Sequence, residues 1–307
     1  MTGNPQPPPH GGDALAAARR LGIDRAELLD LSASLNPVAP DVRPVIARHL
    51  DTALGDYPDD RRATEALAES MGVDAGRLVL TNGGAEAIAL VAQLRPRGWA
   101  DPCDFSLYRR HLTDLDPSGP RWMSDPHNPT GRLAPATERA EVRDEAFYPL
   151  ATGCWTRGDD DTIVLGSLTK AFACPGLRMG YVLAPDAALA DQVAAIRPRW
   201  SVGGLACSAL PDLLALADLV GWQAGIGELR DQLAAALASC GIATDPGTAN
   251  FLWIPEATGL RDHLLGHRIL IRSGASFGHP RAARIAVPTP AGLERLVRAL
   301  STFEAAP

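Results

Sequence analysis

Lys170 and Arg178 are the residues of this sequence whose types and spacing most directly suggest chemistry. Lys170 ends the run GSLTK at 166–170, and Arg178 follows eight residues later in the run GLRMG. A lysine amine that captures an aldehyde cofactor as a Schiff base needs hydroxyl groups and a cation nearby to hold the phosphate of that cofactor. The segment therefore predicts a cofactor-binding lysine. A Ser/Thr-x-x-Lys string alone is a weak signal, because most lysines are solvated surface charges.

Length and charge indicate a globular protein that acts on small molecules. The chain has 307 residues, of which 46% are hydrophobic and 21% charged, enough for one large domain and a smaller one. A formal net charge of -7 argues against a nucleic-acid surface, which needs clustered Lys and Arg. We therefore expect small-molecule partners and no nucleic acid.

The cysteines and the first residues bear on the compartment. The five cysteines, at 103, 154, 174, 207 and 240, never show a C-x-x-C spacing, which predicts neither a disulfide framework nor a metal site. The start MTGNPQPPP lacks a basic stretch followed by an apolar region, and no later segment reaches about 20 apolar residues. We expect a cytoplasmic protein that is neither secreted nor bound to a membrane.

Short apolar strands alternate with helices along the chain, which is the pattern of an α/β layer fold. The clearest unit is a strand at 77–80, a turn with Gly83 and Gly84, and a helix at 86–94. The other expected helices are 13–21, 41–53, 61–71, 186–196, 209–240 and 291–303. The other expected strands are 162–165, 181–183, 250–254, 268–271 and 284–287.

Three further segments carry groups that suit a bound aldehyde cofactor. Glycines between a strand and a helix let the backbone approach an anion, although a lone Gly83-Gly84 is more often a plain turn. Asn128, in the loop DPHNPTG, could donate to a phenolate oxygen. Asp144, in RDEAF, could keep a pyridine nitrogen protonated by charge pairing, and the alternative is a solvated helix acid.

In chain order, the glycine turn, NPTG, DEAF and SLTK with its arginine resemble the fold type I pyridoxal-phosphate enzymes of the aspartate aminotransferase superfamily. The narrower likeness is to the threonine-phosphate decarboxylases of cobalamin biosynthesis, and next to the histidinol-phosphate aminotransferases. It is carried by HGG at 10–12, LSASLNP at 31–37, WSV at 200–202, RILIRS at 268–273 and RIAV at 284–287.

The resemblance implies an overall organisation and a cofactor. The cofactor is pyridoxal 5'-phosphate. The expected parts are an N-terminal arm at 1–36, a large α/β domain with a mostly parallel central sheet flanked by helices at 37–205, and a small C-terminal α+β domain at 206–307.

The resemblance also implies a role for each residue of the cofactor site. Lys170 would form the Schiff base, and Asp144 would pair with the pyridinium nitrogen. Asn128 would bond the ring oxygen and Phe105 would stack on the ring. The phosphate would be held by Gly84, Ala85, Ser167 and Arg178, and by Tyr57 from the neighbouring subunit of a homodimer.

For the substrate, the resemblance implies two groups of ligands. Arg284 would bind the carboxylate of an amino acid, while Arg272, His10 and Asn36 would surround its phosphate. Planar guanidinium groups suit both anions. Without the family context, each arginine is more often a surface strand residue.

Two stretches depart from the family pattern. Between Tyr108 and Asn128, and between Gly131 and Asp144, the chain is shorter than such enzymes are. Residues 139–143 are also too polar for the buried strand that should end at Asp144. Either the large sheet is trimmed or the site is degenerate. Phe147 stands where many aminotransferases have tyrosine, and the decarboxylases resemble this chain in having phenylalanine.

The leading hypothesis is the decarboxylation of a phosphorylated amino acid, bound to the cofactor as an external aldimine in place of Lys170. Which bond at Cα breaks depends on which one is turned out of the ring plane, and Arg284 would set that orientation. If the carboxylate lies in the plane, the same residues give an aminotransferase. A third hypothesis is a protein that has lost catalysis and keeps only a cofactor-binding fold.

Overall fold

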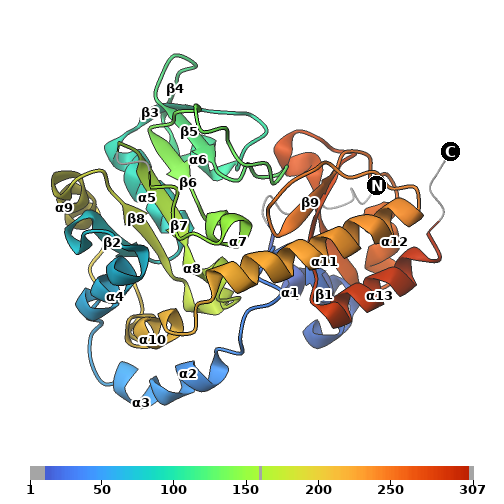
Figure 1. The fold of residues 1–307 in the computed structure, drawn as a ribbon, viewed down its shortest axis with the longest axis horizontal. Coiled ribbons are helices and arrows are strands. Elements are labelled where there is room, and N and C mark those ends of the chain that lie inside the picture. Colours follow the sequence, from blue (N-terminus) through green and yellow to red (C-terminus); the bar gives the residue numbers. More distant parts are fainter. Residues whose placement is uncertain (1–10, 159–160, 304–307) are drawn as a thin grey trace.

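Residues 11–158 and 161–303 are described by the computed structural model, and they form two sheets connected by a long helix (Figure 1). The large sheet has the strand order β2-β8-β7-β6-β5-β3-β4, and the small sheet has the order β1-β10-β11-β9. The long helix, α11 (Leu219–Ser239), runs across both lobes in this view.

The large sheet brings four strand ends to one edge. Its strand β8 pairs antiparallel with β2 and β7, and every other pair in this sheet is parallel. The strands β2, β5, β6 and β7 therefore end at the same edge, where α/β sheets bind ligands. The strands are β2 (Leu78–Thr81), β3 (Arg97–Ala100), β4 (Asp114–Leu115), β5 (Arg121–Ser124), β6 (Val142–Asp144), β7 (Ile163–Ser167) and β8 (Gly180–Leu183).

Helices cover both faces of the large sheet, since its strands are apolar on both sides. Val79, Leu165 and Val182 face one helical layer, while Leu80, Val164 and Leu183 face the other. The first layer contains α5 (Gly84–Leu94), α6 (Leu107–His111) and α9 (Ala187–Ile196). The second contains α2 (Arg43–Arg48), α4 (Arg61–Met71), α8 (Leu168–Ala171) and α10 (Gly204–Leu214). The short helices α3 (Leu50–Ala53) and α7 (Tyr148–Thr152) contact α10 and α11 respectively.

The small sheet includes the N-terminal arm. Strand β1 (Leu29–Leu31) pairs parallel with β10 (Ile269–Ser273), and β10 and β9 (Phe251–Ile254) flank β11 (Ala283–Ala286) in antiparallel pairing. Its core is completed by Leu233 and Leu237 of α11 and by α12 (Leu260–Gly266) and α13 (Pro290–Leu300). Helix α1 (Ala14–Leu21) packs separately, against Leu270.

Helix α11 contributes side chains to the hydrophobic cores of both sheets. Ala206 to Ile226 contribute to the core of the large sheet, whereas Leu229 onward contribute to that of the small sheet. The change from one core to the other thus falls between Ile226 and Leu229, and the expected domain boundary after residue 205 stays a prediction. The helix expected at 209–240 is also interrupted, because the chain turns at 215–218 and Asp218 caps α11 by accepting from the Gly221 N–H at 2.9 Å.

Strand β6 corrects the expectation that 139–143 is too polar for a buried strand. Val142–Asp144 lies between β5 and β7, and the side chain of Arg143 is fully buried. Its guanidinium donates to Asp125 Oδ2 at 3.0 Å and to the Glu138 carbonyl oxygen at 3.1 Å. A buried cation is tolerated when it is paired and hydrogen-bonded in this way.

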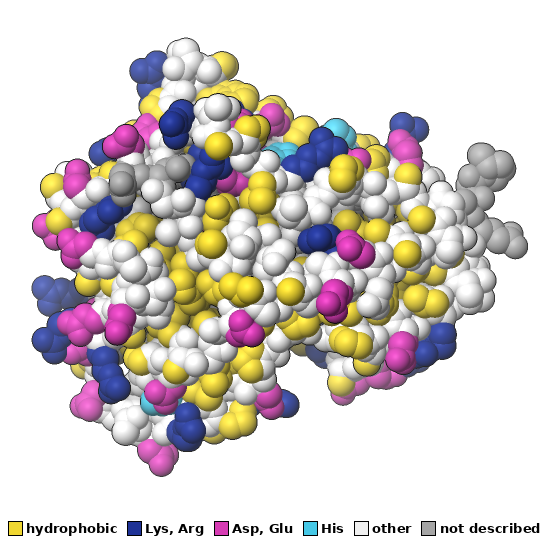
Figure 2. All heavy atoms as spheres, in the orientation of Figure 1, with side chains coloured by type: hydrophobic (Ala, Val, Ile, Leu, Met, Phe, Trp, Pro, Cys, Tyr) yellow, Lys and Arg dark blue, Asp and Glu magenta, His cyan; other side chains and the backbone are white. Residues whose placement is uncertain are grey.

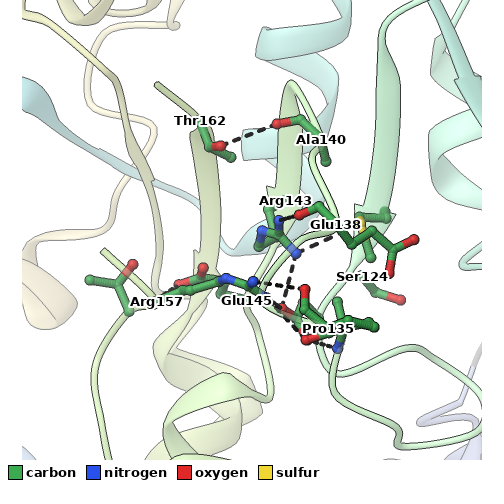
Figure 3. Close-up of polar contacts among 12 residues, drawn as sticks. Ser124, Pro135, Glu138, Ala140, Arg143, Glu145, Arg157 and Thr162 are labelled. Atoms are coloured by element: carbon green, nitrogen blue, oxygen red, sulfur yellow. Dashed lines mark hydrogen bonds and ion pairs between the residues drawn. The ribbon is translucent and has the colours of Figure 1, made fainter. Parts of the chain in front are cut away.

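The trimming affects a connection and leaves the strands in place. The crossover from β5 to β6, residues 125–141, contains no helix. Arg143 and Arg157 both bond Asp125 at 3.0 Å, and Arg157 also donates to the Ala134 carbonyl oxygen. Figure 3 shows Arg157 near Pro135, whose carbonyl oxygen accepts from it. These charge-assisted bonds fasten the crossover loop to the sheet.

No single helix among the described residues is long and apolar enough to cross a membrane. The pair α10 and α11 passes that test jointly by length and composition, with a bend of 88° between its two parts.

Candidate active site

A cavity lies where the strand ends of the large sheet meet the small sheet. Asp144 ends β6, Ser167 ends β7, and Asn128 follows β5 in a turn. Arg272 and Arg284 enter from the small sheet. Ten of the expected site residues line this one cavity, namely Gly84, Ala85, Phe105, Asn128, Asp144, Ser167, Lys170, Arg178, Arg272 and Arg284.

Lys170 projects into this cavity from α8, directly after β7. Its Nζ donates to the Ala33 carbonyl oxygen at 2.8 Å and lies 5.8 Å from the centre of the Phe147 ring. Burial, and after it the charges of Arg284 and Arg272, lower the pKa of this amine to about 8. A lower pKa favours the neutral amine, which is the nucleophilic form.

The composition contains a signal for Lys170 that motif reasoning missed. Lys170 is the only lysine in the sequence, and every other residue among the 29 Lys and Arg is arginine. Arginine serves as a surface cation as well as lysine does, but its guanidinium stays protonated and does not form Schiff bases. A chain with one lysine, placed in the cavity between the two sheets, points to amine chemistry at that position.

Asp144 is held from two sides. Tyr108 donates its hydroxyl to Asp144 Oδ2 at 2.8 Å, and the Ala146 N–H donates to Oδ1 at 3.0 Å. Burial raises the pKa of Asp144 to about 6, against the lowering effect of these two bonds. Tyr108 was not expected as a site residue, because the strand and helix that bring it to β6 are short and polar.

The start of α5 forms an anion cradle. The first internal bond of this helix is made by the Glu86 N–H to the Gly83 carbonyl oxygen at 3.1 Å, which leaves the N–H groups of Gly84 and Ala85 ahead of it. A Cβ on Gly83, whose φ is +79°, would lie within 2.4 Å of Nη2 of Arg178. The glycine therefore lets the guanidinium of Arg178 approach this helix end.

Hydroxyl groups complete the cradle. Ser167 Oγ and Thr169 Oγ1 lie 2.8 Å apart, and both residues line the cavity with Arg178. Thr169 is a site residue that the SLTK run did not predict, because its hydroxyl joins the site through the contact with Ser167 in the folded chain.

Two arginines lie side by side on neighbouring strands of the small sheet. Arg272 on β10 and Arg284 on β11 are direct partners in the antiparallel register, so their side chains leave the same face. Arg284 donates to Asn128 Oδ1 and to the Ser32 carbonyl oxygen, and Arg272 donates to Ser276 Oγ at 3.2 Å. Burial lowers the pKa of Arg272 to about 10, and burial followed by the charge of Arg272 lowers that of Arg284.

Two expected residues that the structure describes, Asn36 and Tyr57, do not line the cavity. Asn36 is buried elsewhere, because its Nδ2 donates to the Ala171 carbonyl oxygen at 2.9 Å and its Oδ1 accepts from the Val38 N–H. These bonds fasten the helix of Lys170, and the expected contact of Asn36 with a substrate phosphate stays a prediction. Tyr57 is 77% exposed and stacks on Trp200 at the surface. His10 lies outside the described residues.

The family model of the class I and II aminotransferases matches residues 103–300. The chain belongs to this aminotransferase family. It is 33% identical to a threonine-phosphate decarboxylase of Salmonella typhimurium, with 95% of each protein covered. It is 26% identical to histidinol-phosphate aminotransferase 1 of Dechloromonas aromatica, with 92% of each covered.

Solved structures of class I and II aminotransferase relatives share the fold. A histidinol-phosphate aminotransferase from Sinorhizobium meliloti in complex with pyridoxal-5'-phosphate superposes with a TM-score of 0.81 at 20% identity, covering 94% of this chain and 93% of that one. An L-threonine-O-3-phosphate decarboxylase from Porphyromonas gingivalis gives a TM-score of 0.75 at 22% identity, covering 90% and 99%. The expected fold type I architecture is confirmed.

The aminotransferase family is pyridoxal-phosphate-dependent, and the cavity suits that cofactor. Its functional groups comprise an amine, an anion cradle at a helix end with two hydroxyls and an arginine, and a partly buried carboxylate. These are the groups that an aldehyde, a phosphate and a pyridinium nitrogen require. The protein is a pyridoxal-phosphate-dependent enzyme, and the individual contacts of these residues stay predictions.

Proposed function

We propose that the protein decarboxylates a phosphorylated amino acid, as a threonine-phosphate decarboxylase does. The observation that carries the proposal is the register pair Arg272 and Arg284, whose guanidinium groups line the same cavity as Lys170. Like charges directly opposite on one face of a sheet repel each other. An amino-acid phosphate has two anionic groups, one for each arginine, and relieves this repulsion on binding.

Arg284 is the candidate ligand for the substrate carboxylate. Its position is fixed by its bonds to Asn128 and Ser32, and its Cζ lies 4.6 Å from the centre of the Phe251 ring. A guanidinium held in this way orients a carboxylate by bidentate bonding. Arg272, whose Cζ lies 4.6 Å from the centre of the Phe277 ring, is then left for the phosphate.

Lys170 and Asp144 are the candidate proton-handling groups. Pyridoxal phosphate, when bound, supplies an electron sink for the pair released when a bond at the substrate Cα breaks. Asp144 holds a proton on the ring nitrogen by charge pairing, which keeps that sink available. The amine of Lys170, once protonated, delivers its proton to Cα, and its lowered pKa eases that transfer near neutral pH.

Transamination is the second candidate, supported by the histidinol-phosphate aminotransferases among the relatives. It would use the same residues, with the amine of Lys170 taking the proton from the substrate Cα and Arg284 retaining the carboxylate. The angle at which Arg284 presents the carboxylate decides between the two reactions.

Two assays distinguish the candidates. The purified holoenzyme is given O-phospho-L-threonine, and carbon dioxide release is compared with keto-acid formation in the presence of 2-oxoglutarate. We expect carbon dioxide, and a much lower rate with threonine, which lacks the phosphate. Steady keto-acid formation without carbon dioxide would establish the aminotransferase. Protein without the cofactor absorbance expected near about 420 nm would indicate the non-catalytic alternative.

We also propose a homodimer in which Tyr57 contacts the cofactor phosphate of the other subunit. Supporting observations are the exposure of Tyr57 and Trp200, at 77% and 52%, and the exposed Leu54 on the preceding turn. Figure 2 shows apolar side chains gathered on the visible face of the large lobe, to the left of α11. Exposed apolar patches of this kind commonly mark protein interfaces.

A further inference from the structure

Asp104 is a buried carboxylate next to the active site with no role in the reaction outlined above. It is 1% exposed and directly precedes Phe105, which lines the cavity. Its two oxygens accept from the Phe105 N–H at 2.6 Å, from the Ser124 N–H at 2.9 Å and from the Ser124 hydroxyl at 2.5 Å. Burying a carboxylate costs several kcal/mol unless donors satisfy it.

The bonds of Asp104 continue to Asn128. The Asn128 N–H donates to Ser124 Oγ at 2.7 Å, so the proton of that hydroxyl is directed to Asp104 Oδ1. One carboxylate thus connects two loops that follow different strands. The first follows β3 and carries Phe105, and the second follows β5 and carries Asn128.

Charge strengthens this connection. All three groups that contact Asp104 are donors, which is the environment of an ionised carboxylate, and bonds to an ionised acceptor are about twice as strong as neutral ones. Burial raises the pKa of Asp104, while the charge of His127 and the hydrogen bonds from Ser124 and Phe105 act against that rise. The negative charge of Asp104 in turn raises the pKa of both Tyr108 and Asp144.

We propose that Asp104 is a positioning residue that fixes Phe105 and, through Ser124, Asn128 at a set separation around the cofactor ring. The proposal rests on the proposed function and on the contacts with that ring that the family resemblance predicts for Phe105 and Asn128. Removing the carboxylate frees the two loops from each other. The ring then binds in a less defined orientation, although Lys170 and the anion cradle are unchanged.

The experiment compares wild-type holoenzyme with Asp104→Asn, Ser124→Ala and the double variant. An asparagine at 104 leaves one N–H donor without an acceptor, because its amide nitrogen cannot accept a hydrogen bond. We expect each single variant to weaken cofactor binding about tenfold by equilibrium dialysis and to reduce the visible circular dichroism of the bound cofactor. Since both act on one chain of bonds, the double variant should be no worse than the weaker-binding single variant.

Amide hydrogen exchange of the apoprotein gives a readout independent of the cofactor. Exchange at Phe105, Ser124 and Asn128 should accelerate in Asp104→Asn, and should stay at wild-type rates in the control Asp114→Asn, whose carboxylate is exposed on β4. Unchanged exchange, unchanged affinity or additive losses in the double variant would overturn the proposal. If Asp104→Asn does not fold, Ser124→Ala decides by the same readouts. A wild-type protein without a cofactor band would instead contradict the proposed function.

Discussion

Burial acts on Lys170 and Asp144 in opposite directions at the residue scale. It lowers the pKa of the amine to about 8 and raises that of the carboxyl to about 6, in each case because the charged form loses hydration. The pKa values of both groups thereby lie closer to neutral pH. This is the condition in which the amine can attack an aldehyde and the carboxylate can still hold a ring proton.

The lowered pKa of Lys170 predicts the pH dependence of cofactor capture. The rate at which apoprotein takes up pyridoxal phosphate should rise with pH through about 8 and level off above about 9, because only the neutral amine attacks the aldehyde. Stopped-flow absorbance measures it. A rise centred near about 10.4, the pKa of a solvated lysine, would contradict the buried position of this amine.

Asp144→Asn should stabilise the apoprotein while impairing cofactor binding. The folded-state pKa of Asp144 lies above its ordinary value of 3.8, so the cost of ionising it is present above about 6 and vanishes as the pH falls toward 3.8. Removing the charge should raise the free energy of unfolding by up to about 3 kcal/mol near pH 8, and by much less near about pH 4. Urea unfolding at both pH values checks this. A loss of apoprotein stability near pH 8 would contradict it.

Sequence patterns could identify site residues that lie in a recognisable short motif. They could not identify site residues that join the site only through tertiary hydrogen bonds. Lys170, Asp144 and Arg178 belong to short runs, and the structure brings them to one cavity. Asn36 also belongs to a run, but its amide turns to the Ala171 carbonyl oxygen, a direction that no spacing encodes. Asp104 and Tyr108 belong to the site through bonds to Ser124 and Asp144, which come from other segments of the chain.

At the scale of elements, the short polar connection between β5 and β6 decides how the trimmed domain holds together. A parallel crossover usually carries a helix that covers the sheet. Here Asp125 and two arginines replace that packing with a buried ionic network. A network of this kind stabilises a loop only while each charge keeps its partners.

Arg143→Met should therefore be strongly destabilising. Breaking a buried ion pair costs about 3–5 kcal/mol, because the remaining charge loses a partner. We expect the midpoint of thermal unfolding to fall by at least about 5 °C. Arg43→Met is the matched control, since Arg43 pairs with Asp41 on the exposed surface and should have little effect. Equal melting temperatures for the two variants would show that the buried ionic network does not stabilise the fold.

Element prediction succeeded where apolar runs were long enough and failed where charge interrupted them. The strands expected near β2, β7, β8, β9, β10 and β11 are present within a few residues. The strands β3, β5 and β6 were not predicted, because none of them contains three consecutive apolar residues. In β6 the interrupting arginine is satisfied by Asp125, which is distant in sequence. Hydrophobic periodicity cannot detect a buried charge that is paired by the tertiary fold.

At the scale of the whole molecule, the cavity depends on both sheets. The large sheet contributes Lys170 and Asp144, while the small sheet contributes Arg272 and Arg284. The cations outnumber the carboxylates around this space, so an anion should stabilise the two lobes against each other.

Phosphate should raise the melting temperature of the apoprotein through these arginines. Binding at 100 times the dissociation constant adds about 2.7 kcal/mol to the free energy of unfolding. The rise should shrink in Arg272→Met and persist in Arg43→Met, with sodium chloride at equal ionic strength as the salt control. A rise of equal size in both variants would assign the effect to other cations.

The proposed homodimer predicts a mass in solution of about twice the 32.4 kDa of one chain. Light scattering of the purified protein measures it. Tyr57→Ala should then weaken cofactor binding, although Tyr57 lies outside the cavity of its own subunit. A monomeric protein whose cofactor affinity is unchanged by Tyr57→Ala would contradict the proposed contact between subunits.

Reduction of the holoenzyme with borohydride tests the central claim most directly. This reagent converts a Schiff base into a stable secondary amine, and the protein offers one side-chain amine for it, Lys170. Peptide mass analysis should locate the pyridoxyl group on the peptide that contains Lys170, and the lysine-free variant Lys170→Arg should carry none. A label at the chain's amino terminus alone, or no label in protein loaded with the cofactor, would contradict the account.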